Sequence, residues 1–182
     1  AVFTRAEEVG LIGARLVAEA GTLPEETLVV SVESSAVIPG VTQGKGPVIR
    51  TGDAARTFDA DAELLLIAAR ESIREREQGF SCQRQLMSGG TCEATAFGAF
   101  GYSVTGVAFP LGNYHNATTS IPDPDGGVGA EYINLSDYLG GVDLIAEAAT
   151  SVAGRDRRQP RWASHAIPDD MRRRLQDTLP AP

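Results

Sequence analysis

The N-terminal part of the chain alternates strand-like runs with a helical pattern, and this feature restricts its fold the most. A short apolar run at residues 1–4 is typical of a buried strand, and the β-branched run at residues 27–32 is nearly continuous in apolar character. Between them, residues 11–20 place apolar and small side chains at helical spacing, and Gly21 ends the pattern. A helix between two buried strands predicts a right-handed crossover, and therefore an α/β fold with a mixed, largely parallel sheet.

The rest of the chain continues this alternation. Short β-branched or alternating segments predict further strands at residues 47–50, 80–86 and 104–109. Apolar residues at helical spacing predict helices at residues 59–77, from the Gly89-Gly90 turn to Gly101, at residues 135–152 and at residues 171–179. Ser136 is the expected cap of the helix at residues 135–152. The Pro- and Gly-rich stretch before it is predicted to be a loop.

The composition is that of a globular protein with one core. The chain has 182 residues, enough for one well-buried domain, and 42% of them are apolar. A net charge of −8 argues against a nucleic-acid partner, and no apolar run is long enough to cross a bilayer, so no membrane partner is expected. Cys82 and Cys92 are too few for a disulfide framework or a cysteine-only metal site. We therefore expect reduced thiols in a cytoplasmic protein.

Two adjacent acids, Glu7 and Glu8, occupy the turn between the first predicted strand and the first helix. Two neighbouring carboxylates that are buried without partners repel each other and cost stability. Bound metal ions would remove that cost, because one carboxylate can ligate a metal while its neighbour acts as a general base on a water molecule. The alternative is a solvated helix N-terminus, where the helix dipole favours acidic residues.

Glu33 and His115 are the other candidate ligands, because each comes directly after a predicted strand. Sites in α/β sheets lie beyond the carboxyl ends of the strands, so Glu33 and the Glu7-Glu8 turn are expected to face the same crevice. His115 lies in a polar loop at the same edge of the sheet, where a neutral imidazole can bind a metal. The ordinary alternatives are a solvated acid for Glu33 and a hydrogen-bonded loop residue for His115.

Two motifs in this order carry a resemblance to a known family. The first is Phe-Thr-x-x-Glu-Glu-Val-Gly-Leu-x-Gly-Ala, which starts at Phe3, and the second is Pro39-Gly40 followed by Gly-Lys-Gly-Pro at residues 44–47. The first resembles the catalytic-base turn of the dinuclear metallo-aminopeptidases, which include glutamyl aminopeptidase and the tetrahedral aminopeptidases. The second favours these enzymes over the related carboxypeptidases and deacylases. The resemblance runs from Ala1 to Val152 and implies a three-layer α/β/α fold.

The resemblance implies a role for each candidate ligand. Glu7 would be the general base and Glu8 a metal ligand. Glu33 would be a ligand in place of the aspartate that is usual in the family, and His115 would be the last metal ligand. Cofactors would be two divalent metal ions, with zinc expected and cobalt or manganese as alternatives.

Three further residues match positions of the family that are not metal ligands but lie near the substrate or beside a ligand. Gln83 and Thr91 match the segment around the Gly-Gly-Thr turn, and Glu131 would orient His115. Cys92-Glu93 stands where the family has an aspartate, and Asn113 stands near an arginine position of the family, so the substrate pocket is expected to differ.

The implied function is metal-dependent hydrolysis of peptides, as an aminopeptidase, by a metal-bridged water that Glu7 activates. The substrate would be a peptide and the protein a homo-oligomer. The alternatives are a related carboxypeptidase or deacylase, and a non-catalytic relative that acts as a scaffold.

The resemblance also implies a domain division. Residues 1–153 match the C-terminal portion of the catalytic domain, and the first residue, Ala1, is not methionine. We therefore expect a cut within a larger protein, in which a histidine and a bridging aspartate precede Ala1. Residues 154–182 form a basic, Pro-containing extension, in which His165 is expected to be structural or exposed.

Overall fold

A five-stranded mixed sheet forms the centre of the fold, which is described by a computed structural model for residues 1–119, 123–154 and 169–178. The strands are β1 (Leu28–Ala36), β2 (Val48–Asp53), β3 (Gln83–Met87), β4 (Ser103–Gly112) and β5 (Tyr132–Ile133). Their order is β1-β4-β2-β3, and β5 pairs with the end of β4. β4 runs parallel to β1 and antiparallel to β2 and β5, while β2 and β3 are parallel. Because β1 pairs with β4 over its whole length, the sheet is mostly parallel.

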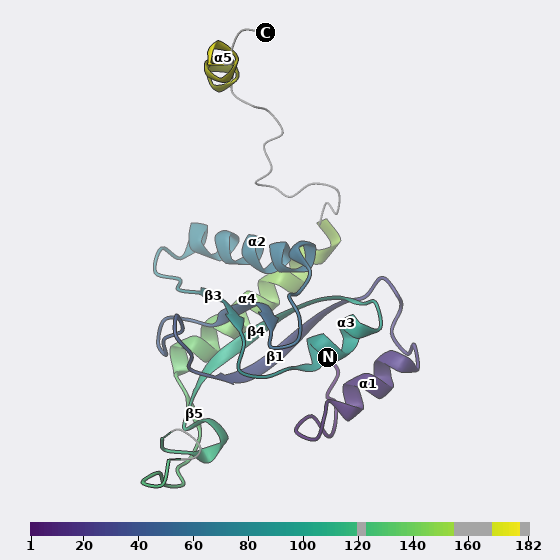
Figure 1. The fold of residues 1–182 in the computed structure, drawn as a ribbon, viewed down its shortest axis with the longest axis vertical. Helices are drawn as coiled ribbons and strands as arrows, with labels where there is room; N and C mark the ends of the chain where they lie inside the picture. The colour runs from purple at the N-terminus through teal and green to yellow at the C-terminus, as the bar shows by residue number, and fades with distance from the viewer. Residues whose placement is uncertain (120–122, 155–168, 179–182) are drawn as a thin grey trace.

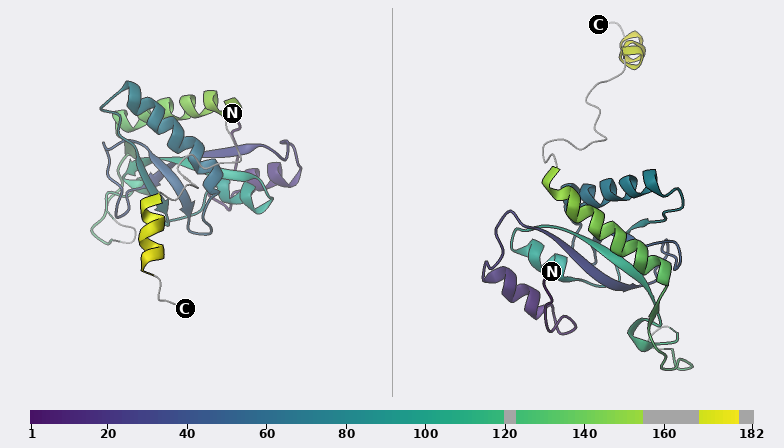
Figure 2. Two further views of the ribbon diagram at one scale, coloured as in Figure 1. Left: turned by 90° about the horizontal axis from the view of Figure 1, so that it is seen from above. Right: turned by 180° about the vertical axis from the view of Figure 1, so that it is seen from behind.

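Helices cover both faces of this sheet (Figures 1 and 2). The helices that cover it are α1 (Ile12–Glu19), α2 (Ala60–Arg76), α3 (Glu93–Ala99) and α4 (Leu135–Ser151). The described chain also contains α5 (Asp169–Asp177) and the 3-10 turns η1 (Tyr114–Asn116) and η2 (Val152–Gly154). α2 and α4 share a core with Ile49 and Val107, whereas α1 and α3 share a core with Val29 and Val104. Neighbouring residues of a strand point to opposite faces, so one sheet supplies both cores. The predicted three-layer α/β/α fold is confirmed.

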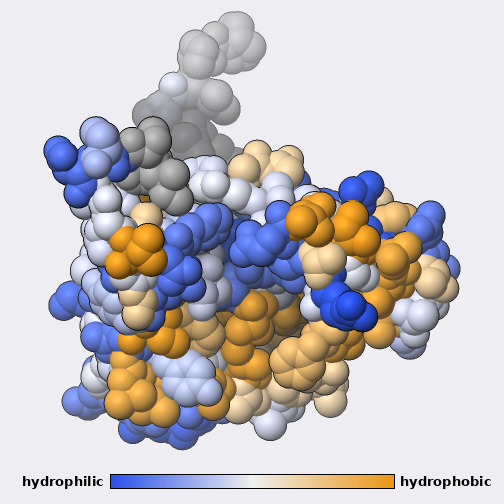
Figure 3. Space-filling model, turned by 90° about the horizontal axis from the view of Figure 1, so that it is seen from below, coloured by the Kyte–Doolittle hydropathy of each residue, from blue (hydrophilic) through white to orange (hydrophobic). Residues whose placement is uncertain are grey.

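The N-terminal segment is not the strand that the sequence predicts. Val2 and Phe3 are 58% and 94% exposed, and residues 1–4 have no strand assignment. The peptide groups that follow bind the start of α1 instead: the N–H of Gly13 donates to the carbonyl oxygen of Arg5 at 2.9 Å. A strand needs a neighbour for its backbone groups, and this apolar run has none within the described chain. Exposed hydrophobic residues gather on the right of the face in Figure 3, on the side where Figure 1 places α1.

The end of β1 and the cap of α4 also differ from the prediction. β1 continues past Glu33 to Ala36, because Ser34 and Ser35 pair in register with the long strand β4 despite their polar, loop-like character. α4 begins as predicted, but its cap is Asn134, whose Oδ1 accepts a hydrogen bond from the N–H of Ser136 at 2.9 Å. Glu33 therefore lies inside a strand, with its backbone fixed by the ladder.

The described residues also bear on the cysteines and on membrane-crossing helices. Cys82 and Cys92 are buried free thiols, as expected. Among the helices in residues 1–119, 123–154 and 169–178, none combines the length and the apolar character that crossing a bilayer requires. His165 lies outside the described residues.

Candidate active site

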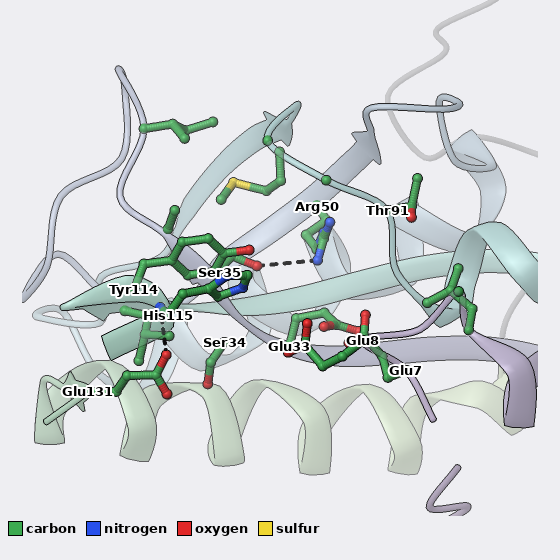
Figure 4. Close-up of a pocket in the computed structure, with 18 residues that line it drawn as sticks. Glu7, Glu8, Glu33, Ser34, Ser35, Arg50, Thr91, Tyr114, His115 and Glu131 are labelled. Carbon is green, nitrogen blue, oxygen red and sulfur yellow. Dashed lines mark hydrogen bonds between the residues drawn. The ribbon is translucent and has the colours of Figure 1, made fainter. Parts of the chain in front are cut away.

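A cavity of about 550 Å³ lies beside the carboxyl end of β1, and most of the predicted site residues line it (Figure 4). Glu7 and Glu8 reach it from the turn before α1, and residues 33–36 reach it from β1. The segment at η1 and the Gly89-Gly90 turn complete its walls. The cavity thus joins segments that are far apart in the sequence, as the position of sites in α/β sheets predicts.

Three carboxylates converge here, and two of them, Glu7 and Glu33, line the cavity. One oxygen atom each from Glu7, Glu33 and Glu93 lie within 4.8 Å of one another. Glu33 points to the α1–α3 face because it alternates along β1 with Val32, and Glu93 is the first residue of α3 on that same face. Glu8 is the neighbour of Glu7 and lines the cavity, although it does not belong to this group of three.

Glu33 and Glu93 form a pair that shares a proton. Burial, followed by the hydrogen bond to Glu93, raises the pKa of Glu33 from 4.5 to about 8. Burial also acts to raise the pKa of Glu93, but hydrogen bonds from Glu33, Thr4 and Ser31 outweigh it and lower that pKa. Thr4 Oγ1 donates to Glu93 at 3.0 Å, and Ser31 Oγ donates to Glu33 at 2.6 Å. The two shifts have opposite directions, so Glu33 is the member of the pair that holds a proton more strongly.

Neighbouring charged residues also act on Glu7. Burial raises its pKa above 4.5, the charges of Glu8 and Glu93 raise it further, and His115 lowers it. A carboxylate whose pKa is shifted toward neutrality is better suited to accept and return a proton during a reaction.

His115 borders the cavity in a strained backbone conformation. Its φ is 56°, in the left-handed region, and its ring stacks on that of Tyr114 with centroids 4.0 Å apart. Glu131 Oε1 accepts a hydrogen bond from the backbone N–H of His115 at 2.8 Å. Glu131 therefore binds His115 through its backbone, and its role in orienting His115 stays a prediction. His115 is not within the group of three carboxylates.

The two residues predicted near the Gly-rich turn are placed differently. Thr91 lines the cavity, whereas Gln83 does not. The amide of Gln83 binds the segment that follows Pro39-Gly40: its Oε1 accepts from the N–H of Thr42 at 2.8 Å, and its Nε2 donates to the carbonyl oxygen of Gly46 at 2.8 Å. The position of Gln83 thus favours a structural role.

Sequence reasoning did not assign two residues that the structure brings to the site. Glu93 was noted only as a replacement for an aspartate, although its place after a Gly-rich turn at a helix start was an available signal. Arg50 is predicted only as the last residue of the strand at residues 47–50. Arg50 lines the cavity with 3% of its surface exposed, and its Nη1 donates to Ser35 Oγ at 3.4 Å.

The residues present fit a divalent cation. Three carboxylates within 4.8 Å of one another, one of which has a raised pKa, are a donor set of hard oxygen atoms, and none of the ion pairs among the described residues includes them. A cation in their midst would replace the shared proton and relieve the repulsion among them.

Comparison with solved structures places this fold among the TET aminopeptidases. The PhTET1-12s structure, a dodecamer, is 30% identical with a TM-score of 0.58. The TET1 peptidase of Pyrococcus horikoshii, which can assemble into a tetrahedron or a large octahedral shell, is 26% identical with a TM-score of 0.60. Each match covers 81% of this chain but 39% of the relative. A TET aminopeptidase from Thaumarchaeota archaeon SCGC AB-539-E09 shares the fold at 23% identity and a TM-score of 0.59, over 79% of this chain and 38% of that one.

The chain therefore spans about two fifths of the length of these relatives. No curated protein sequence matches it. The profile of the M42 glutamyl aminopeptidase family matches residues 1–124, which include Glu7, Glu8, Glu33, Glu93 and His115. The chain belongs to the M42 glutamyl aminopeptidase family.

Proposed function

We propose that this chain carries part of the active site of a metal-dependent aminopeptidase, which hydrolyses the first peptide bond of a peptide substrate. The observation that supports this most is the convergence of the carboxylates of Glu7, Glu33 and Glu93, of which Glu7 and Glu33 line the same cavity as His115, in a member of a peptidase family. A solvated surface does not require one of its acids to stay protonated near neutral pH, and Glu33 does.

In this proposal, Glu8, Glu33 and His115 are ligands of two divalent metal ions, for which zinc is our first candidate. Carboxylate oxygen and imidazole nitrogen are common ligands of such ions. Bound ions would supply Lewis acidity at the scissile carbonyl group and make a water molecule more acidic. Glu93 is close enough to Glu33 to join the ligand set or to take over the hydrogen bonding of Glu33.

Glu7 is the proposed general base. It accepts a proton from the attacking water and returns it to the amine that leaves. Its raised pKa makes the first transfer easier than for an ordinary glutamate, and its neighbours Glu8 and Glu93 contribute to that shift. The backbone N–H groups of Gly10 and Leu11 both donate to the carbonyl oxygen of Glu7, at 3.0 and 2.9 Å, so the turn holds the base in place.

We also propose that the protein is a homo-oligomer in the cytoplasm. The dodecameric PhTET1-12s and the shells of the Pyrococcus horikoshii peptidase support assembly. Exposed hydrophobic residues at the N-terminal segment and α1, with Phe3 94% and Val9 72% exposed, are consistent with surfaces that another chain covers.

The test is the Glu7→Gln variant of the native protein, with Glu19→Gln, an exposed acid at the end of α1, as the matched control. Hydrolysis of aminoacyl anilides should fall at least about 100-fold in Glu7→Gln, the usual contribution of a general base, and should be unchanged in Glu19→Gln. The metal content, measured by elemental analysis, should stay the same in all three proteins. Retained turnover in Glu7→Gln would contradict the assignment of the base, and lost metal would make Glu7 a ligand instead.

A further inference from the structure

The backbone is strained at two places, and both border the cavity. Among the described residues, those that have a positive φ and are not glycine are Ala6, Leu11, Asn113, His115 and Asn116. The first two flank the turn that carries Glu7 and Glu8. Left-handed backbone costs free energy for a residue with a Cβ, and it persists only where the surrounding structure holds it. The strain therefore coincides with the segments that bring the candidate base and the candidate histidine to the cavity.

Three of these residues lie within four positions of the chain, around the histidine. Their φ angles are 51° at Asn113, 56° at His115 and 60° at Asn116. Elsewhere in the described chain, glycine occupies six positions of positive φ, which it adopts without steric cost. A histidine in such a position, at a cavity, indicates that its side chain is needed there.

Side-chain amides hold this segment against the residues that precede β5. Asn113 Nδ2 donates to the carbonyl oxygen of Ala130 at 2.8 Å, and Asn116 Nδ2 donates to that of Gly129 at 3.2 Å. The N–H of Gly129 donates in turn to the carbonyl oxygen of Asn116 at 2.8 Å. Asn113 also packs closely on Gly129, where an added Cβ would lie 2.8 Å from its Nδ2. The two asparagines therefore tie the backbone on both sides of His115 to the same short segment.

The base of this loop is anchored as well. Gly112, at the end of β4, pairs with Tyr132 of β5. Gln43 Nε2 donates to the carbonyl oxygens of Pro110 and Tyr132, at 3.0 and 3.3 Å. The bonds of the asparagines extend this rigid base outward to His115, so the histidine is attached to the sheet through backbone that is held on both sides.

The held backbone also determines where the imidazole lies. The rings of Tyr114 and His115 stack with centroids 4.0 Å apart and planes at 25°. Both residues line the cavity, and Figure 4 shows them together on the side away from Glu7 and Glu8. A change in the φ of His115 to the ordinary negative region would re-aim its Cβ and break this stack.

We propose that Asn113 is a positioning residue for His115. Its amide holds the histidine in the left-handed conformation that presents the imidazole to the cavity, and Asn116 assists from the other side. This inference rests on the proposed function, in which His115 is a metal ligand. A group that orients a ligand without touching the metal raises the metal affinity, because the ligand is already in place when the ion arrives.

The test is a titration of the full chain with zinc ion alone, followed through the imidazole nitrogen resonances of His115 by NMR. These resonances are assigned by their loss in His115→Gln. Asn113→Gly keeps the freedom to adopt a positive φ but removes the amide, and Asn113→Asp keeps the shape of the side chain but cannot donate to Ala130 when it is ionised. Asn134→Ala is the matched control, because it removes the hydrogen bond of another asparagine, the cap of α4.

Zinc should shift the resonances of His115 in the unaltered chain, and its affinity should fall by about tenfold or more in both Asn113 variants. Asn134→Ala should bind zinc as the unaltered chain does, although it is less stable. Without metal, in EDTA, the nuclear Overhauser contact between the rings of Tyr114 and His115 should weaken in the Asn113 variants and persist in the control.

Unchanged zinc affinity in both Asn113 variants would overturn the inference, as would an equal loss in Asn134→Ala, which would make the effect one of stability alone. A zinc titration that leaves His115 unshifted in the unaltered chain would instead contradict its proposed role as a ligand. The ring contact in EDTA then decides the inference, which fails if the contact persists in the Asn113 variants. If neither of these variants folds, Asn116→Gly is the second test, and unchanged affinity and ring contact in it would refute the positioning role.

Discussion

Glu33→Gln should remove most of the dependence of stability on pH between pH 5 and 8 in the metal-free protein. Burial and the hydrogen bond to Glu93 raise the pKa of Glu33 from 4.5 to about 8 in the folded state. Between these two values the folded protein holds a proton that the unfolded chain has released. The stabilisation by this proton is complete below pH 4.5 and is lost as the pH rises through about 8. Glutamine cannot titrate, but its amide N–H can still donate to Glu93.

The size of the effect follows from the two pKa values. A change from 4.5 to about 8 corresponds to about 5 kcal/mol of unfolding free energy as an upper limit. Of this, about 3.5 kcal/mol falls between pH 5 and 8, because the unfolded chain still holds about a quarter of a proton at pH 5 and the folded protein about half of one at pH 8. For a chain of this size, that is a decrease in Tm of about 7–14 °C.

The assay is urea and thermal unfolding at pH 5, 6.5 and 8 with EDTA, for the unaltered protein, Glu33→Gln and the control Glu19→Gln. The unaltered protein and Glu19→Gln should lose stability over this range, and Glu33→Gln should lose much less. Other carboxylates contribute their own pH dependence, so the quantity to compare is the difference between variants at each pH. An identical slope for Glu33→Gln and the unaltered protein would refute the shared proton, and with it the reason for expecting a cation at this site.

Two further predictions concern the packing around the site. Gly13→Ala should lower the free energy of unfolding by about 2–3 kcal/mol, because the added Cβ would lie 2.5 Å from the carbonyl oxygen of Arg5. Gly79→Ala, where no atom lies within 4 Å, is its control in urea unfolding; equal stability of the two would contradict the docking of the N-terminal segment on α1. Cys82 and Cys92 should resist a thiol reagent at pH 8 in the native protein, because burial raises the pKa of each to about 11 and leaves little thiolate. Modification of either at the rate of a free thiol would show that its surroundings open.

The parts of the structure that depend on local periodicity were predictable from the sequence. α2 and α4 begin and end within a residue or two of their expected positions, because apolar spacing and polar flanks determine a helix locally. Glu7, Glu33 and His115 were expected at one edge of the sheet, and the structure places all three at one cavity. That expectation rested on the rule for strand ends in α/β sheets, although Glu7 reaches the cavity from a turn that no strand precedes and Glu33 reaches it from inside β1. The chemical roles of these residues stay predictions.

Glu93 and Arg50 could not be predicted in the same way, because their positions depend on pairing between distant segments. Glu93 meets Glu33 only because α3 packs on the face of β1 to which Glu33 points, and no local pattern states which face a helix will cover. Arg50 reaches the cavity only because its partner in the antiparallel ladder is a glycine, so its orientation is determined by the register between β2 and β4. A shift of that register by one residue would bring Arg50 opposite Val107 or Thr105, and would turn the guanidinium away from the cavity. The position of Arg50 at the cavity is therefore a property of strand register, and a sequence comparison that ignores register would not identify it.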